Sequence, residues 1–496
     1  MSLERRDTGR TLVSGRWVVG HQDGRHLLLE RGEVVFEDGA IVFVGHAFPG
    51  EVARRIDRPD ALIAPGFVDL DAVSDLDTAV LSLDNTPSWR KGRVWPQSYV
   101  ARGPYEMYAP DELAFQKRYA FAQLLRNGVT TALPIASLFY RQWGETYDEF
   151  AAAAQAAEEL GLRVYLGPAY RSGHTVVDEA GTVSLLIDEA RGLAGLDDAV
   201  RFCRDMEGRA GGLVRTMLAP DRIEGCTPEL LRRTAEAARA LDVPLRLHCH
   251  QSRFEVDEVA KRHGLSPTGW LASLGLLGPR VLLPHFTDFP AFDGVSTRER
   301  DLATLLEADA TVVHCPVVMA RNGAVLDQLS DLRERGLRIG LGTDTWPPDM
   351  ILNMQVGLML GRVMARSVSR PSSAEMFDAA TWIGADALGR PDLGRLMPGA
   401  RADLIAIDFG HDGIGQVIDP IQTLMQSSCG RDVTDVIVDG RLVMEGRILP
   451  GFDAAATHRQ AQAQFDGLIA RYPDRTFGHP PVSEIFTPTY PLRRAP

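Results

Sequence analysis

The stretch Ala64-Pro65-Gly66-Phe67-Val68-Asp69-Leu70-Asp71-Ala72-Val73 decides the fold of this 496-residue chain. It follows residues 10–63, in which apolar and polar side chains alternate as they do in short antiparallel strands. Beyond it, short apolar runs alternate with amphipathic stretches such as 111–126 and 227–241. Because buried strands that alternate with helices are typical of parallel sheets, the pattern predicts a parallel α/β barrel.

The composition of the chain is acidic. The chain carries 53 Lys+Arg against 66 Asp+Glu, a net charge of −13, so we expect no nucleic-acid partner and no anionic membrane partner. No apolar run approaches the roughly 18 residues of a membrane span, and residues 1–7 lack the apolar core of a signal peptide. The 5 cysteines are scattered and odd in number, which indicates a reducing compartment. We expect a cytoplasmic protein. We also expect a homo-oligomer, a homodimer in the simplest case, and a small-molecule substrate.

Residues 65–73 resemble the first barrel strand of the amidohydrolase superfamily, which is written P-G-F-x-D-x-H-x-H. Other segments resemble later strands of that family and occur in its order: 124–131, 218–220, 247–256, 280–285, 312–316, 340–344, 379–385 and 399–404. The chlorohydrolase and nucleobase-deaminase-like branch is the most similar.

The resemblance implies an α/β fold made of a (β/α)8 TIM barrel and a small β-sandwich domain built from both chain ends. The barrel is expected at 64–392, and the sandwich at 1–63 and 393–450. A C-terminal helix and a Pro-rich tail are expected at 451–496.

The two histidines of the family motif bind a catalytic metal, but this chain has Asp71 and Val73 in their places. Asp71 keeps an oxygen ligand, whereas Val73 cannot bind a metal. Asp75 and Asp77 follow in one short loop and could lend a carboxylate. The resemblance thus implies a site that has lost part of its ligand set.

The remaining ligands that the resemblance implies are His248, His285 and Asp344, which end the fifth, sixth and eighth strands. Together with Asp71 they would hold one divalent ion, Zn²⁺, Fe²⁺ or Mn²⁺. No lysine lies in 213–220, so the carbamylated lysine of dinuclear members cannot form and one ion is the maximum. The alternative is a metal-free site in which Asp71 acts as a general base or accepts a hydrogen bond from the substrate. No organic cofactor is expected.

The chemistry of a TIM barrel lies at the C-terminal ends of its strands, which gathers these residues at one mouth. We expect His285 and Asp344 to activate a water molecule there. Gln251 stands where deaminases of the family carry a glutamate that protonates the substrate ring. An amide cannot shuttle a proton, so Gln251 is expected to hold a carbonyl or amide edge, and ordinary aminopurine or cytosine deamination is in doubt.

Candidate substrate-binding residues surround this cluster. Arg171 and His174 follow the third strand and could contact an anionic or carbonyl-bearing substrate, with a solvated loop as the alternative. Trp95 and Trp346 could stack on a flat heterocycle, or simply pack their loops. His250 could line the pocket beside His248, and His314 could contact substrate or make a structural hydrogen bond.

The function that these residues favour is hydrolysis of a non-peptide carbon–nitrogen bond in a small polar, cyclic or heteroaromatic compound, by attack of an activated water. Two alternatives remain open at this point. One is a metal-free lyase or isomerase that uses His285 and Asp344 as an acid–base pair. The other is an inactive protein that binds a small molecule.

Overall fold

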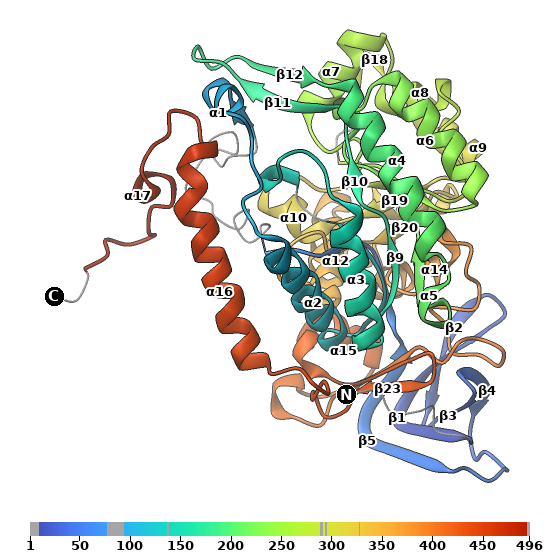
Figure 1. Ribbon diagram of the computed structural model, residues 1–496. Coiled ribbons are helices and arrows are strands. Elements are labelled where there is room, and N and C mark those ends of the chain that lie inside the picture. The colour runs from blue at the N-terminus through green and yellow to red at the C-terminus, as the bar shows by residue number, and fades with distance from the viewer. Residues whose placement is uncertain are drawn as a thin grey trace.

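A computed structural model gives the fold and describes residues 9–76, 94–135, 138–287, 291–292, 295–326 and 328–493. Parallel strands form its centre, with helices outside them and a separate sheet at one end (Figure 1). Within the described part of the chain, no helix is both long enough and apolar enough to cross a membrane. Asp77, one of the expected carboxylates, lies outside the described residues.

Two four-stranded parallel sheets make the barrel, in the orders β13-β9-β8-β6 and β15-β16-β19-β20. A bridge between Leu218 and Leu245 joins the fourth strand to the fifth, and the Asp344 N–H donates to the Asp71 carbonyl at 2.7 Å to join the eighth to the first. The strands are β6 (Phe67–Val73), β8 (Val129–Ile135), β9 (Arg163–Leu166), β13 (Val214–Thr216), β15 (Leu245–Arg246), β16 (Val281–Pro284), β19 (Thr311–His314) and β20 (Arg338–Leu341). The predicted (β/α)8 barrel is confirmed.

The barrel strands are buried on both faces, which explains their unbroken apolar runs. One face packs a core inside the barrel around Leu70, Leu133 and Leu282, and the other face packs against helices. The longer helices of this layer are α2 (Pro110–Arg126), α3 (Tyr147–Leu160), α4 (Glu189–Met206), α6 (Pro228–Leu241), α7 (Arg253–His263), α9 (Arg298–Ala308) and α12 (Met350–Ala365). Shorter ones are α1 (Gln97–Arg102), α8 (Pro267–Ser273), α10 (Pro316–Arg321), α11 (Leu329–Glu334), α13 (Ser373–Ala379), α14 (Trp382–Ala387) and α15 (Pro420–Ser427).

Both chain ends share the second sheet, as predicted. The N-terminal strands are β1 (Thr11–Gln22), β2 (Arg25–Glu30), β3 (Glu33–Glu37), β4 (Ala40–Gly45) and β5 (Arg54–Pro65). The C-terminal ones are β21 (Leu404–Asp408), β22 (Val433–Val438) and β23 (Arg441–Met444), and β21 pairs with β5 in antiparallel fashion. A buried ion pair between Arg163 of β9 and Asp403, with Nε 2.9 Å from Oδ2, ties the barrel to this sheet.

The last segment of the chain returns to the barrel. Helix α16 (Ala454–Arg471) lies beside α2 (Figure 1). The turn that follows, η7 (Tyr472–Arg475), packs Tyr472 against Tyr140, with hydroxyl groups 3.2 Å apart. A short helix, α17 (Val482–Ile485), follows. The C-terminal segment therefore covers part of the helical layer near the first strands of the barrel.

Candidate active site

The end of the first strand carries two buried aspartates with different partners. Asp69 accepts hydrogen bonds from the Thr343 hydroxyl at 2.6 Å and from the Thr343 N–H at 3.0 Å, which ties the first strand to the eighth. The pairing of β6 with β8 shifts register between Asp69 and Ala72. Because such a shift re-aims side chains, Asp71 can meet residues of the fifth and seventh strands.

The fifth strand supplies a cation and a histidine on the same side. Arg246 and His248 are two residues apart, and both reach Asp71 inside the barrel. The Arg246 Nη1 lies 3.5 Å from Asp71 Oδ1, and the His248 Nε2 lies 3.9 Å from Asp71 Oδ2. The His248 Nδ1 is 2.6 Å from the Asp221 carbonyl, to which it donates, so Nε2 is left with the lone pair that faces Asp71.

His285 completes a group of three. It follows β16 with a φ of 83°, and its ring stacks on the His248 ring with centroids 5.3 Å apart. One ligand atom from each of Asp71, His248 and His285 lies within 4.8 Å of the others, and all three residues are buried. The structure thus brings together three of the four ligands predicted from the sequence.

The fourth predicted ligand, Asp344, lies next to this group but does not join it. The Asp344 N–H donates a hydrogen bond to the Asp71 carbonyl, and Asp344 itself has a φ of 57° directly after Thr343. Its negative charge raises the pKa of Asp71, which places the two carboxylates near each other. A position beside the ligand group, outside the shortest contacts, is suited to a base that acts on a bound water.

Burial dominates the electrostatics of the site. It raises the pKa of Asp71 well above the usual range, against the opposing charge of Arg246, and it raises the pKa of Asp69 to about 6. Burial also lowers the pKa of His248 well below its usual range, with the charge of Arg222 acting in the same direction. His248 is therefore a neutral imidazole at neutral pH, the form that binds metals.

These residues fit one divalent ion. Among the described residues no group donates a hydrogen bond to Asp71 Oδ1, although this atom is buried and the Arg246 Nη1 lies 3.5 Å from it. A carboxylate and two imidazoles are a donor set that Zn²⁺, Fe²⁺ and Mn²⁺ accept. Asp71 has replaced one histidine of the family motif, and Val73, which is buried, supplies nothing. Asp71, His248 and His285 would hold the ion.

Gln251 is oriented by two neighbours. Arg222 donates a hydrogen bond from Nη1 to the Gln251 Oε1, and the Gln251 N–H donates to Glu255 Oε2 at 2.9 Å. Glu255 is buried and also accepts the His250 N–H at 2.5 Å, so one carboxylate fixes the start of α7 and the loop before it. Gln251 therefore stands at the barrel mouth with its carbonyl end already occupied.

Arg171, His174 and Trp95 form a buried cluster, so the solvated-loop alternative is wrong. The Arg171 Nη1 pairs with Asp221 Oδ2 at 3.5 Å, and its guanidinium lies 5.8 Å from the centre of the Trp95 ring. His174 packs edge-on against Trp95 with ring centroids 3.8 Å apart. Since the Asp221 carbonyl also accepts the His248 hydrogen bond, this cluster adjoins the metal-binding group.

Two predicted pocket histidines face other parts of the molecule. The His250 Nε2 lies 2.9 Å from the Thr268 hydroxyl of α8, because a φ of 56° at His250 ends the strand alternation after His248. His314 is in register with Leu341, which packs on the helix side, whereas Val313 and Cys315 face the barrel interior. Burial lowers the pKa of His314 to about 4. His250 thus contacts α8, and His314 lies on the helix-facing side of its strand, where its Nδ1 has no hydrogen-bond partner among the described residues.

Trp346 closes the loop after the eighth strand. Its indole N–H donates to the Asp75 carbonyl at 2.6 Å, and its ring stacks on Tyr119 at 5.3 Å. These contacts join the end of the eighth strand to the loop that follows the first. They occupy one face and the polar edge of the ring, in accordance with the loop-packing alternative.

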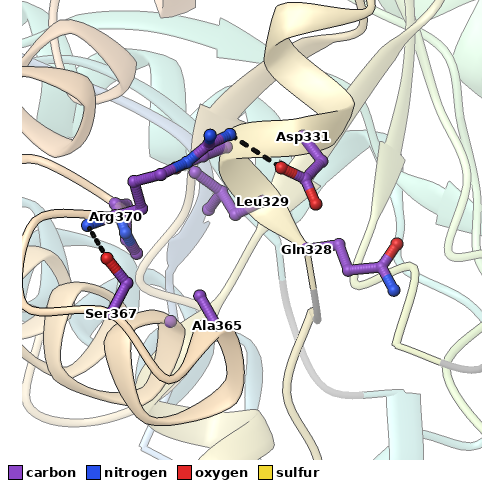
Figure 2. Close-up of a pocket in the computed structure, with 9 residues that line it drawn as sticks. Gln328, Leu329, Asp331, Ala365, Ser367 and Arg370 are labelled. Atoms are coloured by element: carbon purple, nitrogen blue, oxygen red, sulfur yellow. Dashed lines mark hydrogen bonds and ion pairs between the residues drawn. The ribbon is translucent and has the colours of Figure 1, made fainter.

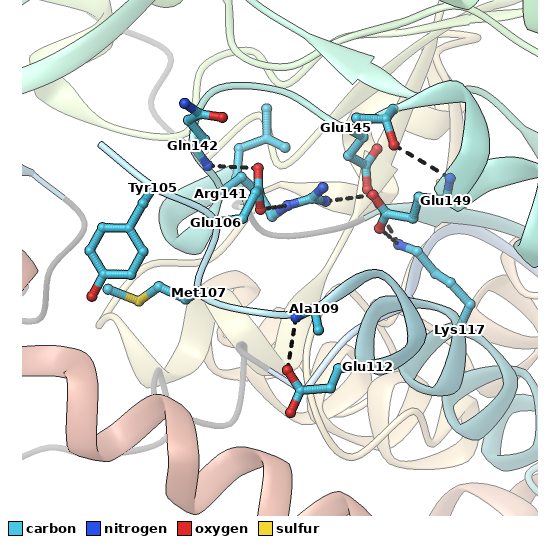
Figure 3. Close-up of polar contacts among 12 residues, drawn as sticks. Tyr105, Glu106, Met107, Ala109, Glu112, Lys117, Arg141, Gln142, Glu145 and Glu149 are labelled. Atoms are coloured by element: carbon cyan, nitrogen blue, oxygen red, sulfur yellow. Dashed lines mark hydrogen bonds and ion pairs between the residues drawn. The ribbon is translucent and has the colours of Figure 1, made fainter. Parts of the chain in front are cut away.

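A buried ion network joins Lys117, Arg141 and the carboxylates around them (Figure 3). The Lys117 Nζ is 3.3 Å from Glu145 and 3.2 Å from Glu149, and Arg141 bridges Glu149 at 2.7 Å and Glu106 at 2.8 Å. Lys117 also donates to the Ser74 hydroxyl at 3.0 Å. The network thereby anchors α2 and α3 to the end of β6, where Asp71 lies.

Three residues of the site were not predicted from the sequence. Arg246, Asp221 and Arg222 contact Asp71, His248 and Gln251 respectively. Strand alternation in 245–248 could have found Arg246, because it shares a face with His248. No local signal marks Asp221 and Arg222 beyond their place at the end of the fourth strand.

A pocket of about 200 Å³ lies elsewhere, between α11 and the end of α12 (Figure 2). Ser330, Gly361, Ala365 and Pro371 are among its lining residues, and Arg370 reaches across it to Asp331 at 2.7 Å. None of the predicted site residues lines it. It is separate from the chemistry at the barrel mouth.

Comparisons with known proteins agree with this architecture. A sequence model described as the amidohydrolase family matches residues 62–443. A 5-methylthioadenosine/S-adenosylhomocysteine deaminase of Natronomonas pharaonis is 27% identical over 441 residues, which cover 88% of this chain and 93% of that protein. A 5'-deoxyadenosine deaminase of Methanothermobacter thermautotrophicus is 27% identical over 423 residues, which cover 84% of this chain and 90% of that protein.

Solved structures share the fold. An adenosine deaminase from Xanthomonas campestris with bound zinc superposes with a TM-score of 0.75 at 22% identity, covering 92% of this chain and 98% of that one. A mutant of atrazine chlorohydrolase from Arthrobacter aurescens, complexed with zinc and atraton, gives a TM-score of 0.75 at 21% identity, covering 92% and 99%. The match to the family model extends over most of the chain, from β5 to β23, and the chain therefore belongs to the amidohydrolase family.

Proposed function

We propose that this amidohydrolase removes an exocyclic nitrogen substituent from a small nitrogen heterocycle by hydrolysis. The family and the deaminase relatives make it a hydrolase of carbon–nitrogen bonds other than peptide bonds. Beyond this class, we propose that the substrate is a heterocycle and that the bond that is hydrolysed is exocyclic. The observation that carries the proposal is the group of Asp71, His248 and His285 at the barrel mouth, with Asp344 beside it.

An ion held by Asp71, His248 and His285 would supply a water of lowered pKa as the nucleophile. Asp344 would accept the proton of the attacking water; its backbone N–H bonded to the Asp71 carbonyl and its carboxylate close to Asp71 support this role. His248 stays neutral and is kept in one tautomer by the Asp221 carbonyl. Arg246 offsets the charge of Asp71 through their ion pair.

The barrel mouth also limits where protons can come from. Gln251 cannot donate a proton, so protonation of the leaving amine falls to Asp344 once it has taken the proton from the water. The buried Trp95, His174 and Arg171 close the neighbouring wall and help to exclude bulk water. The site is thus suited to a leaving group that departs as a neutral amine.

The test is ammonia release by the purified protein supplied with Zn²⁺, with adenosine, 5'-deoxyadenosine, guanine, cytosine and aminotriazines as substrates. The deaminase relatives keep aminopurines in this panel, although Gln251 stands in place of the ring-protonating glutamate. We expect steady turnover of at least one of these compounds, and a loss of about 10²- to 10⁴-fold after Asp344→Asn. Absence of ammonia and of any other hydrolysis product from all of them would contradict the proposal.

We also propose a homo-oligomer in the cytoplasm. Exposed apolar side chains on α12 and just after it support self-association. The exposed fractions are 55% for Met359, 71% for Val363 and 90% for Val368. Light scattering during size-exclusion chromatography should give a multiple of 54.3 kDa. A monomer at micromolar concentration would contradict this expectation.

A further inference from the structure

The turn η7 brings a buried arginine into an aromatic cluster near the candidate site. Arg475 is 0% exposed. Its Cζ lies 5.5 Å from the centre of the Trp95 ring, 5.7 Å from that of Tyr99 and 5.1 Å from that of Tyr140. The family model matches residues 62–443, so Arg475 belongs to a segment outside that match. The C-terminal segment thus supplies a cation to aromatic rings that come from the barrel part of the chain.

Trp95 joins Arg475 to the wall of the candidate site. Its strand, β7 (Trp95–Pro96), pairs in parallel with β11 (Gly173–Val177), which carries His174. The Trp95 ring packs edge-on against the His174 ring, with centroids 3.8 Å apart. Arg475 and His174 therefore lie against the same indole ring, and a shift of Trp95 is passed on to His174.

The wall continues from His174 to the metal-binding group. Arg171 pairs with Asp221, and the Asp221 carbonyl accepts the hydrogen bond from His248. Burial lowers the pKa of His174 well below its usual range, and the charges of Arg171 and Arg475 lower it further. This effect of charge shows that the Arg475 guanidinium lies within electrostatic reach of the wall.

Hydrogen bonds fix the turn that carries Arg475. The Tyr105 hydroxyl donates to Asp474 Oδ2 at 2.9 Å. The Ser98 Oγ lies 2.6 Å from His479 Nε2. Because Asp474 and His479 flank Arg475 in the sequence, the backbone of the turn is held on both sides of this residue.

We infer that Arg475 is a positioning residue of the active site, which holds Trp95 in place and thereby fixes the wall that Arg171 and His174 form. A guanidinium attracts the faces of aromatic rings within about 6 Å, and the attraction is stronger when the cation is removed from water. A neutral side chain would lose this attraction, and a smaller one would also leave a cavity behind the indole. The inference goes beyond the proposed function, because it concerns the wall and not the reacting bond.

The experiment that tests the inference is hydrogen exchange of the full-length protein, read by mass spectrometry on peptides that cover 95–102 and 173–187. Arg475→Met removes the charge at a similar side-chain length and should raise exchange in both peptides by about 5- to 30-fold. Arg475→Lys keeps a charge and should raise exchange less. Arg459→Met is the matched control, because Arg459 is exposed on α16 of the same segment, and it should match the wild type. Peptides from β1 and β5 report on the fold and should stay unchanged in every variant.

Unchanged exchange of the 173–187 peptide in Arg475→Met would overturn the inference. An increase in every peptide would mean that this variant has lost the whole fold, and Arg475→Lys would then decide. An increase confined to the two wall peptides in Arg475→Lys would support the inference, whereas wild-type exchange or a general increase would contradict it. The measurement needs no substrate, so its outcome does not depend on the proposed function.

Kinetics supply a second readout, with any compound that the ammonia assay shows to be turned over. A loosened wall weakens binding in the ground state and the transition state alike, so Arg475→Met should raise KM by about 5- to 30-fold and leave kcat within about twofold. A lower kcat with an unchanged KM would show that Arg475 does not act through the wall, and would overturn the inference while the hydrolase proposal stands. Failure of every compound in the ammonia assay would instead remove the proposed function and leave the exchange measurement to decide this inference.

Discussion

The Arg246 guanidinium and the Asp71 carboxylate form an ion pair inside the barrel, with Nη1 3.5 Å from Oδ1. Arg246 also donates to the Leu133 carbonyl at 3.2 Å, so its position is fixed by the second strand. Both residues are almost fully buried. The pair explains how a carboxylate can occupy a family position that normally holds a neutral histidine: the chain supplies a compensating charge from two residues before His248.

Breaking this pair should destabilise the protein. Arg246→Met removes the cation that offsets the burial of Asp71, whose pKa burial already raises, and breaking a buried ion pair in this way typically costs about 3–5 kcal/mol. Thermal and urea unfolding followed by circular dichroism should show the loss. Adding Asp71→Asn to Arg246→Met should recover part of it, because the buried charge is then removed. Equal stability of Arg246→Met and the wild type would show that the pair is unimportant to the fold.

Asp344→Asn should stop catalysis and leave the fold intact. The φ of 57° at this position suits asparagine as well as aspartate, so the backbone needs no adjustment. Loss of the base should lower kcat by about 10²- to 10⁴-fold. Asp309→Asn is a matched control, since Asp309 also has a positive φ, 53°, but lies exposed at the end of α9. Retained activity in Asp344→Asn would remove this residue from the mechanism.

His26 should make the contact between the sheet and the barrel sensitive to acid. Its Nε2 lies 3.1 Å from the Thr381 hydroxyl, and burial, followed by the nearby charge of His21, lowers its pKa to about 3. The unfolded chain binds a proton near pH 6.5 and the folded chain does not. The free energy of unfolding therefore does not change with the titration of His26 above pH 6.5. As the pH falls from 6.5 towards 3, it decreases by up to about 1.4 kcal/mol per pH unit.

The measurement is the unfolding midpoint of the wild type and of His26→Gln between pH 7.5 and 4.5. His26→Gln should flatten the decline on acidification, although it lowers stability at neutral pH. The exposed His46 of the same region provides the control His46→Gln, which should follow the wild type. A wild type and a His26→Gln variant with parallel pH profiles would disprove the assignment.

The fold could be predicted from the sequence because its signals are local and ordered. Short apolar runs, helix-forming stretches and the stretch from Ala64 to Val73 each depend on neighbouring residues. Pairing of the two chain ends, by contrast, was implied only by the resemblance to a family. Once the order of strands is known, the C-terminal ends of the barrel strands place His248 and His285 together.

Other parts of the site depend on backbone details that residue types do not show. His250 was expected to point as His248 does, but its φ of 56° turns it towards Thr268. Arg246 was overlooked because its role depends on a carboxylate in a distant strand. Arg171 reads as a loop residue in the sequence, yet its contact with Asp221 and the tryptophan rings buries it. Long-range pairing and left-handed backbone conformations account for these differences.

The central claim is that Asp71, His248 and His285 hold one divalent ion, and metal analysis tests it most directly. The protein would be stripped with a chelator, dialysed against Zn²⁺ and examined by elemental analysis, with Asp71→Asn and His248→Gln alongside. His263→Gln is the control, because His263 lies at the end of α7 and stacks on Trp270 with centroids 3.9 Å apart. The account predicts one ion per chain in the wild type and in His263→Gln, and a clear loss in the other two variants. Two ions per chain, or one ion retained in both Asp71→Asn and His248→Gln, would contradict it.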